Sequence, residues 1–90
     1  MTRSFDEFRR VCVIFESRPD GGLRVYSDDV PGFVLSHPDR DAVMNDIVPA
    51  LETIIAAMVG RRVAVRLSGE PPASRAFDRS KAEYETRLAA

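Results

Sequence analysis

Residues 9–36 read RRVCVIFESRPDGGLRVYSDDVPGFVLS, and this stretch decides the fold class. Three segments within it, 9–16, 23–27 and 33–36, are rich in β-branched and aromatic residues, which predicts strands. Pro19 and Gly21-Gly22 indicate the first turn, and Pro31-Gly32 indicates a type II turn, in which glycine accepts the positive φ of the third position. We expect the first two strands to pair as an antiparallel hairpin, with the third strand beside the second.

The first of these segments is apolar on both of its faces. Val11, Val13 and Phe15 share one face, and Cys12 and Ile14 lie on the other. A strand that is apolar on both sides is typical of the interior of a sheet covered on both faces. We therefore expect a central position for it.

A long amphipathic helix should follow over residues 39–58. Apolar residues recur at helical spacing through this segment, and either Ser36 or Asp39 could cap its start. Pro49 lies inside the segment and cannot donate a backbone hydrogen bond, which predicts a kink or break. Gly60 is a typical helix end.

The last predicted strand spans 61–68, where Val63, Val65 and Leu67 alternate with polar or small residues. A right-handed strand–helix–strand crossover would place it parallel to the first strand, in the order 3-2-1-4. Residues 69–73 resemble a Pro-rich spacer and 74–90 a polar helix. The predicted fold class is therefore α+β: β-β-β-α-β with a mostly antiparallel sheet, one long helix on one face and a C-terminal helix. One domain spans 1–70, with its core at 9–68, and a tail spans 71–90.

The composition restricts the classes of function. Ninety residues suffice for one domain, and 44% hydrophobic with 30% charged residues is a globular composition. A net charge of −1 argues against general nucleic-acid or anionic-membrane binding. One cysteine, no apolar run of membrane length and no signal-peptide pattern at the N-terminus predict a cytoplasmic protein.

Catalysis is not expected. Glu16, Glu52 and Glu70 form no obvious cluster of the kind that metal-dependent nucleases require, so we predict no metal site and no cofactor. Cys12 lies in an apolar strand, where we expect a buried, unreactive thiol. His37, the only histidine, is expected at the start of the helix or in a loop.

The order of these features resembles the HicB-like antitoxin domain and related small domains of unknown function with a degenerate RNase-H-like fold. The pieces that carry the resemblance are Gly21-Gly22, the run 29–32 (Asp-Val-Pro-Gly) and the interrupted helix around Pro49, within a similarity that covers roughly 11–67. The resemblance implies a non-catalytic protein-binding module that neutralises a small, basic, RNA-cleaving toxin. Since residues after 68 can form at most one helix, a helix-turn-helix is not expected, which argues against DNA binding.

Two groups of residues are candidates for contacts with such a partner. One is the turn with its two carboxylates, which could meet a basic partner or begin a metal site, although Asp at such a place more often serves only to form the turn. The other is the pair of outward arginines on the last strand, which could equally protect an edge strand from unwanted pairing. The candidate partner-binding residues are Asp28, Asp29, Pro31, Gly32, Arg62 and Arg66.

The second face of the sheet should also need a cover, because a single long helix covers only one side. The tail, a second subunit or a partner could supply it. The candidate interface residues are Cys12, Ile14, Phe77 and Tyr84, and we expect a homodimer or larger oligomer. The alternative to an antitoxin-like module is a stand-alone homo-oligomeric domain without a toxin partner.

Overall fold

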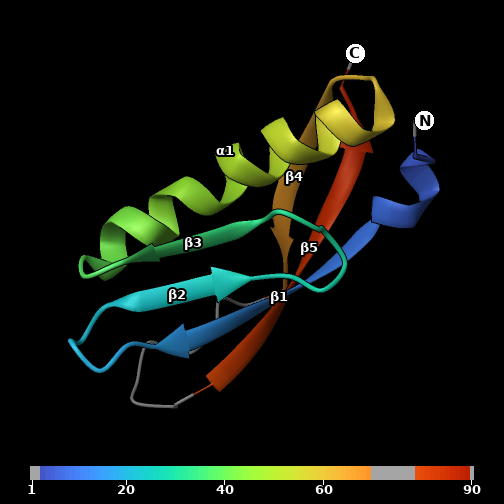
Figure 1. Ribbon diagram of the computed structural model, residues 1–90. Helices are drawn as coiled ribbons and strands as arrows, with labels where there is room; N and C mark the ends of the chain where they lie inside the picture. Colours follow the sequence, from blue (N-terminus) through green and yellow to red (C-terminus); the bar gives the residue numbers. More distant parts are fainter. Residues whose placement is uncertain (1–2, 70–78, 90) are drawn as a thin grey trace.

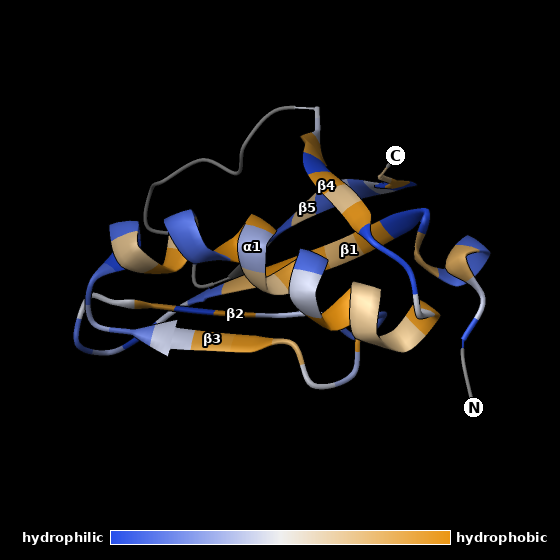
Figure 2. Cartoon of the chain, turned by 90° about the horizontal axis from the view of Figure 1, so that it is seen from above, coloured by the Kyte–Doolittle hydropathy of each residue, from blue (hydrophilic) through white to orange (hydrophobic). Residues whose placement is uncertain are grey.

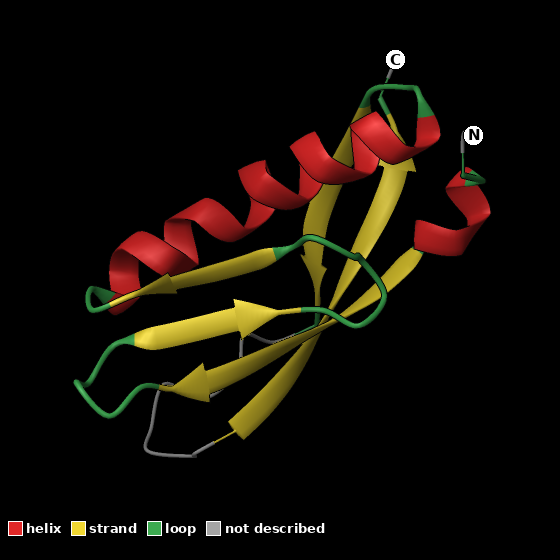
Figure 3. Cartoon of the chain, in the orientation of Figure 1, coloured by secondary structure: helices red, strands yellow, loops and turns green. Residues whose placement is uncertain are grey.

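One antiparallel sheet with a long helix across one face makes up the described part of the computed structural model, residues 3–69 and 79–89 (Figures 1 and 3). A short 3-10 helix precedes the sheet. In chain order the elements are η1 (Phe5–Phe8), β1 (Arg10–Ser17), β2 (Leu23–Tyr26), β3 (Val34–His37), α1 (Arg40–Val59), β4 (Val63–Ser68) and β5 (Arg79–Leu88).

The two predicted turns join β1, β2 and β3 as expected. Gly21 and Gly32 have φ values of +86° and +88°, which only glycine adopts without strain. The N–H of Phe33 donates to the carbonyl of Val30 at 3.1 Å, closing the turn around Pro31-Gly32. The turn prediction is confirmed, and both Val30 and Phe33 enter the core.

The predicted strand order 3-2-1-4 and the C-terminal helix are wrong. The sheet has the order β3-β2-β1-β5-β4, so β5 occupies the place beside β1 that the analysis assigned to the 61–68 strand. Tyr84 of β5 pairs with Val11 of β1 on one side and with Leu67 of β4 on the other, antiparallel in both cases. Of the segment predicted as helix, 74–78 and residue 90 lie outside the described residues.

The predicted C-terminal helix was favoured by oppositely charged residues four apart, such as Lys81 and Glu85, which stabilise helices. Residues four apart share a face of a helix, but they also share a face of a strand, so charge spacing alone does not distinguish the two. The decisive pattern is the alternation of charged Lys81, Glu83 and Glu85 with buried Ala82 and Tyr84. A period of two predicts a half-buried strand.

Helix α1 begins at the cap Asp39, whose carboxylate accepts the N–H groups of Asp41 at 3.0 Å and Ala42 at 3.3 Å. It continues without a break through Pro49, which lies on the exposed side, where a lost backbone bond disturbs the sheet contact least. Gly60, at φ +72°, ends it. The residues buried against the sheet are Val43, Ile47, Leu51, Ile55 and Val59.

The opposite face of the sheet is not the continuous apolar surface that the sequence predicted. Ile14 is buried, but Cys12 is exposed, contrary to the expected buried thiol. β5 adds charged side chains to this face, including Glu83, which forms an ion pair with Arg10 at 3.2 Å. This face therefore carries polar side chains over β5 and β4 and needs no apolar cover there.

α1 is apolar enough, by length and composition, to cross a bilayer, with a mean hydropathy of 1.6. The sequence analysis expected no such run. Its hydrophilic residues are concentrated toward the N-terminal half (Figure 2). Because Ile47, Leu51 and Ile55 are at most 1% exposed against the sheet, α1 is the core helix of a small globule.

Candidate partner-binding groove

β3 forms an unprotected edge of the sheet. Among the described residues it pairs only with β2, and its sequence, Val-Leu-Ser-His, carries no acidic side chain, Lys, Arg or Pro to discourage a further strand. Val34 is 54% exposed. An edge strand directs every second backbone N–H and C=O away from its partner, so β3 offers free main-chain groups.

The other edge, β4, is protected by the helix. Oε2 of Glu52 on α1 accepts the backbone N–H of Val65 at 2.9 Å, and Val65 is buried. A carboxylate bound to an outward N–H leaves that position unable to pair with another strand. The two edges of the sheet therefore differ, and β3 is the one that stays open.

A surface groove runs between β3 and α1. One part, of about 390 Å³, is lined by Leu35, Asp46, Pro49, Ala50, Thr53 and Ile54. An adjoining part, of about 260 Å³, is lined by Leu35, Ser36, His37, Ala42, Val43 and Asp46. The two parts share Leu35 and Asp46, and we call them together the β3–α1 groove.

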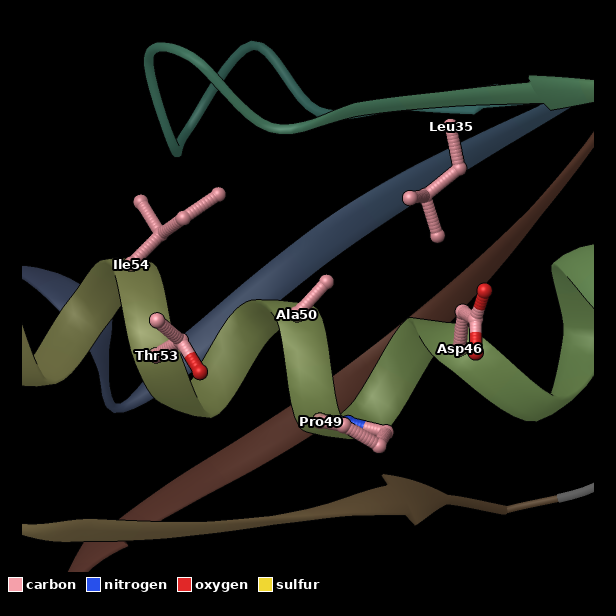
Figure 4. Close-up of a pocket in the computed structure, with 6 residues that line it drawn as sticks. All are labelled: Leu35, Asp46, Pro49, Ala50, Thr53 and Ile54. Atoms are coloured by element: carbon pink, nitrogen blue, oxygen red, sulfur yellow. The ribbon is translucent and has the colours of Figure 1, made fainter.

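The local structure explains why these side chains converge. Leu35 pairs with Val25, whose side chain is in the core, so Leu35 points from β3 toward the helix (Figure 4). Asp46, Ala50 and Ile54 follow at intervals of four residues on one side of α1, and they point toward β3 (Figure 4). Because Ala50 is small, space remains between the helix and the strand.

Asp46 is the one acidic side chain among the residues that line the groove. The Asp46 carboxylate is exposed and has no hydrogen-bond or ion-pair partner in the described ranges. Nδ1 of His37 accepts the N–H of Asp39 at 2.9 Å, which fixes the orientation of the ring. The nearby guanidinium of Arg40 donates to the carbonyl of Gly22 at 3.0 Å and is half-buried. Asp46 therefore presents its negative charge to a ligand in the groove.

Side chains of the acidic turn between β2 and β3 form hydrogen bonds to the backbone of β1. Asp29 accepts the N–H of Cys12 at 2.8 Å, and the Ser27 hydroxyl donates to the carbonyl of Cys12 at 2.6 Å. The Ser27 hydroxyl also accepts the N–H of Asp29 at 3.1 Å. These side chains therefore replace backbone pairing just beyond the end of β2. Asp28, Pro31 and Gly32 are exposed in the same loop.

The candidate arginines lie at the opposite edge of the sheet from that turn. Arg66 on β4 donates to Glu85 at 2.9 Å, and this hydrogen bond holds the pKa of Glu85 below its ordinary value. Arg62 is exposed just before β4, and its carbonyl accepts the N–H of Ala89. The structure therefore does not bring the two candidate partner-binding groups into one site.

The candidate interface residues also lie apart. Tyr84 shares the helix face of the sheet with Val11 and is buried, which raises the pKa of its phenol. Cys12, the next residue after Val11, faces the other side, as does Ile14. Phe77 lies outside the described residues.

Metal-dependent chemistry finds no support in the described part of the chain, which contains no group of three His, Cys, Asp or Glu residues that could hold an ion. Glu16 pairs with Arg24 at 2.9 Å, and Glu52 binds the backbone of Val65. Glu70 lies outside the described ranges.

No protein-family model, no curated protein and no solved structure matches the chain. The resemblance to HicB-like antitoxins therefore stays a prediction, and the interpretation of the groove depends on its own geometry.

Sequence reasoning missed the groove, although one signal was present. Between residues 42 and 59 only Asp46 and Glu52 are charged, so the side of α1 that faces away from the sheet consists mainly of small, uncharged residues. A solvated helix face usually carries more charge. The edge position of β3 is the same in the predicted order, so placing β5 inside the sheet was not needed to find it.

Proposed function

We propose that this protein is a non-catalytic protein-binding module, similar in role to a HicB-type antitoxin that neutralises a small, basic, RNA-cleaving toxin. The observation that carries the proposal is the β3–α1 groove: an apolar hollow beside an unpaired edge strand, with the unpartnered Asp46 carboxylate on its wall. Such a combination supplies main-chain hydrogen bonds, apolar contact and one charge to a protein partner.

The chemistry of the groove favours binding over catalysis. Its titratable side chains are Asp46 and His37, and the His37 ring already accepts a backbone N–H. General acid–base or nucleophilic catalysis needs a second positioned group within hydrogen-bond reach of the first. We propose a cytoplasmic location as well, because the exposed Cys12 thiol suits a reducing compartment.

The test is affinity purification of the tagged full chain from its native host, followed by mass spectrometry and a functional assay. We expect one small, basic protein in near-equal amount. The purified partner should cleave RNA, and an equimolar amount of this protein should stop the cleavage. Recovery of the bait alone would contradict the proposal, as would a partner whose RNA cleavage is unaffected.

The open edge of β3 also supports the alternative, a homo-oligomer formed by strand pairing between two copies. Light scattering after size exclusion at micromolar concentration would then give about twice the 10.0 kDa chain mass. A lysine on the exposed edge, Val34→Lys, should return such a dimer to the monomer. A mass of one chain for the unmodified protein would eliminate this alternative.

A further inference from the structure

We propose that the β3–α1 groove binds an extended segment of the partner, which adds to the sheet as a sixth strand against β3 and directs one basic and at least one apolar side chain toward α1. This inference rests on the proposed protein-binding function and specifies its ligand. It places recognition at the groove and away from the turn 28–32 and from Arg62 and Arg66.

The two edges of the sheet differ in the main-chain groups that they offer to an added strand. β3 has four residues in strand conformation, which at about 3.3 Å per residue matches a short strand of a partner. At the β4 edge Glu52 already binds the N–H of Val65, so strand addition there would break a formed hydrogen bond. Strand addition is therefore favoured at β3.

One side of an added strand would face the helix. Alternate residues of that strand would point toward α1, over the hollow formed by Leu35, Ala50 and Ile54. The hollow has a volume of about 390 Å³ and is open to solvent, so a side chain of an added strand can reach it. An aliphatic side chain placed there would bury apolar surface on both partners.

Charge distinguishes a foreign strand from a second copy of this chain. A basic side chain next to the apolar one would meet the unpartnered carboxylate of Asp46. A second copy would offer its own β3, which contains no Lys or Arg, and would bring another Asp46 to the interface. A partner strand with a basic residue therefore complements the groove better than β3 of this chain.

The probe is an acetylated and amidated heptapeptide, Thr-Val-Thr-Lys-Thr-Val-Thr, in which both Val and the Lys share one face. Titrated into the ¹⁵N-labelled full chain, it should shift the backbone amide resonances of β3 and of residues 42–54 saturably, with a Kd of about 1 mM or tighter. A peptide with Glu in place of Lys should bind at least about 5-fold more weakly, since it places two carboxylates together.

Two matched pairs of variants locate the contact. Asp46→Asn should weaken the Lys peptide about 2–5-fold, the range for one exposed ion pair, while Asp28→Asn removes the same charge from the exposed turn and should change nothing. Ala50→Leu should fill the hollow and abolish binding, while Ala57→Leu, on the exposed side of the same helix, should not. Unchanged thermal unfolding of each variant would show that its fold is intact.

Main-chain pairing is tested by N-methylation of the peptide. Methylation of the peptide amides that face β3 should abolish binding. Methylation of the alternate amides, which face away from β3, should leave the affinity unchanged, because only one edge of the added strand faces β3. Equal effects of both sets, equal binding of the Lys and Glu peptides, or shifts confined to the sheet face away from α1 would each overturn the inference. So would a dimer whose β3 amides are already protected from hydrogen exchange.

The failures of the two proposals are distinguishable. A purified toxin-like partner whose affinity is unaffected by Asp46→Asn and Ala50→Leu would overturn the groove inference and leave the proposed function standing. Peptide binding at β3 together with recovery of the bait alone would support the strand-binding groove and remove the antitoxin-like role.

Discussion

At the residue scale, Ser27 and Asp29 contribute to the sheet through their side chains. Together they satisfy both backbone groups of Cys12 after β2 has ended. Backbone groups left without partners near the core are costly, so a turn that supplies an acceptor and a donor at the correct spacing stabilises the strand beside it. The sequence analysis weighed this structural role for Asp29 against partner contact.

We predict that Ser27→Ala and Asp29→Ala each lower the free energy of unfolding by about 1–2 kcal/mol. The double variant should lose less than the sum, because the Ser27 hydroxyl also accepts the N–H of Asp29. Urea denaturation of the four proteins measures this. Strictly additive losses would show that the two side chains act independently.

Thr86 presents the opposite situation. It is 5% exposed on β5, and within the described residues its hydroxyl has no hydrogen-bond partner. Thr86→Val keeps the β-branched shape and removes the unsatisfied group, so we expect the free energy of unfolding to rise by about 1 kcal/mol. Thr53→Val on the exposed side of α1 is the control and should be near neutral. A loss of stability for Thr86→Val in urea denaturation would mean that the hydroxyl is satisfied.

At the element scale, the two edge strands have different protection. Glu52 extends from α1 to the backbone of Val65 on β4, whereas β3 has no such cover among the described residues. An edge is protected when its outward N–H groups are already bonded. The helix therefore determines which edge of the sheet is available.

We predict that Glu52→Ala lowers the free energy of unfolding by about 1–3 kcal/mol, because it leaves the buried N–H of Val65 without an acceptor. Glu52→Gln keeps a carbonyl acceptor and should lose less. Denaturation measures stability, and light scattering should show new self-association of the Ala variant through β4. Equal stability of Glu52→Ala and the unmodified chain would contradict the assigned role.

The ion pair between β4 and β5 predicts a pH dependence. The hydrogen bond from Arg66 lowers the pKa of Glu85 in the folded protein below the ordinary value of 4.5. Its stabilising contribution is therefore present above that ordinary value and is lost as the pH falls through the lowered folded-state pKa. Glu85→Gln should be less stable than the unmodified chain at pH 7, and the difference should shrink toward zero in strong acid. A difference that is constant with pH would exclude this linkage.

At the scale of the whole molecule, β5 joins the two parts of the sheet. Strands β1 and β4 run in the same direction, and each pairs with β5, which is antiparallel to both. The sheet that supports α1, and with it the β3–α1 groove, therefore depends on the last strand of the chain.

We predict that a chain ending at Gly69 loses cooperative unfolding, because β1 and β4 lose their shared partner and the core side chains beside them become exposed. A synthetic peptide of residues 79–89, added in trans, should restore the transition, while a scrambled peptide should not. Circular dichroism during urea denaturation measures both. A truncated chain with an unchanged midpoint would show that β5 is dispensable.

The sequence by itself determined the local structure. The apolar periods of 9–36 and 39–58, the glycines at the turns and Gly60 were sufficient to predict the first three strands, α1 and the α+β class, because these features depend on neighbours within a few residues. The alternation of residues 80–88 contained the signal for β5, but the i,i+4 charge pairs fit a strand as well as a helix.

Only the tertiary structure decided the order of the strands and the shape of the groove. Inserting β5 between β1 and β4 is a long-range pairing that no local pattern encodes. That insertion is stabilised by backbone hydrogen bonds on both sides of one strand and by the burial of Tyr84 and Ala82 beneath α1. β3 is an edge strand in the predicted and in the observed order, but the bond from Glu52 to β4 and the space above Ala50 appear only in the folded molecule, because each depends on residues that are distant in the chain.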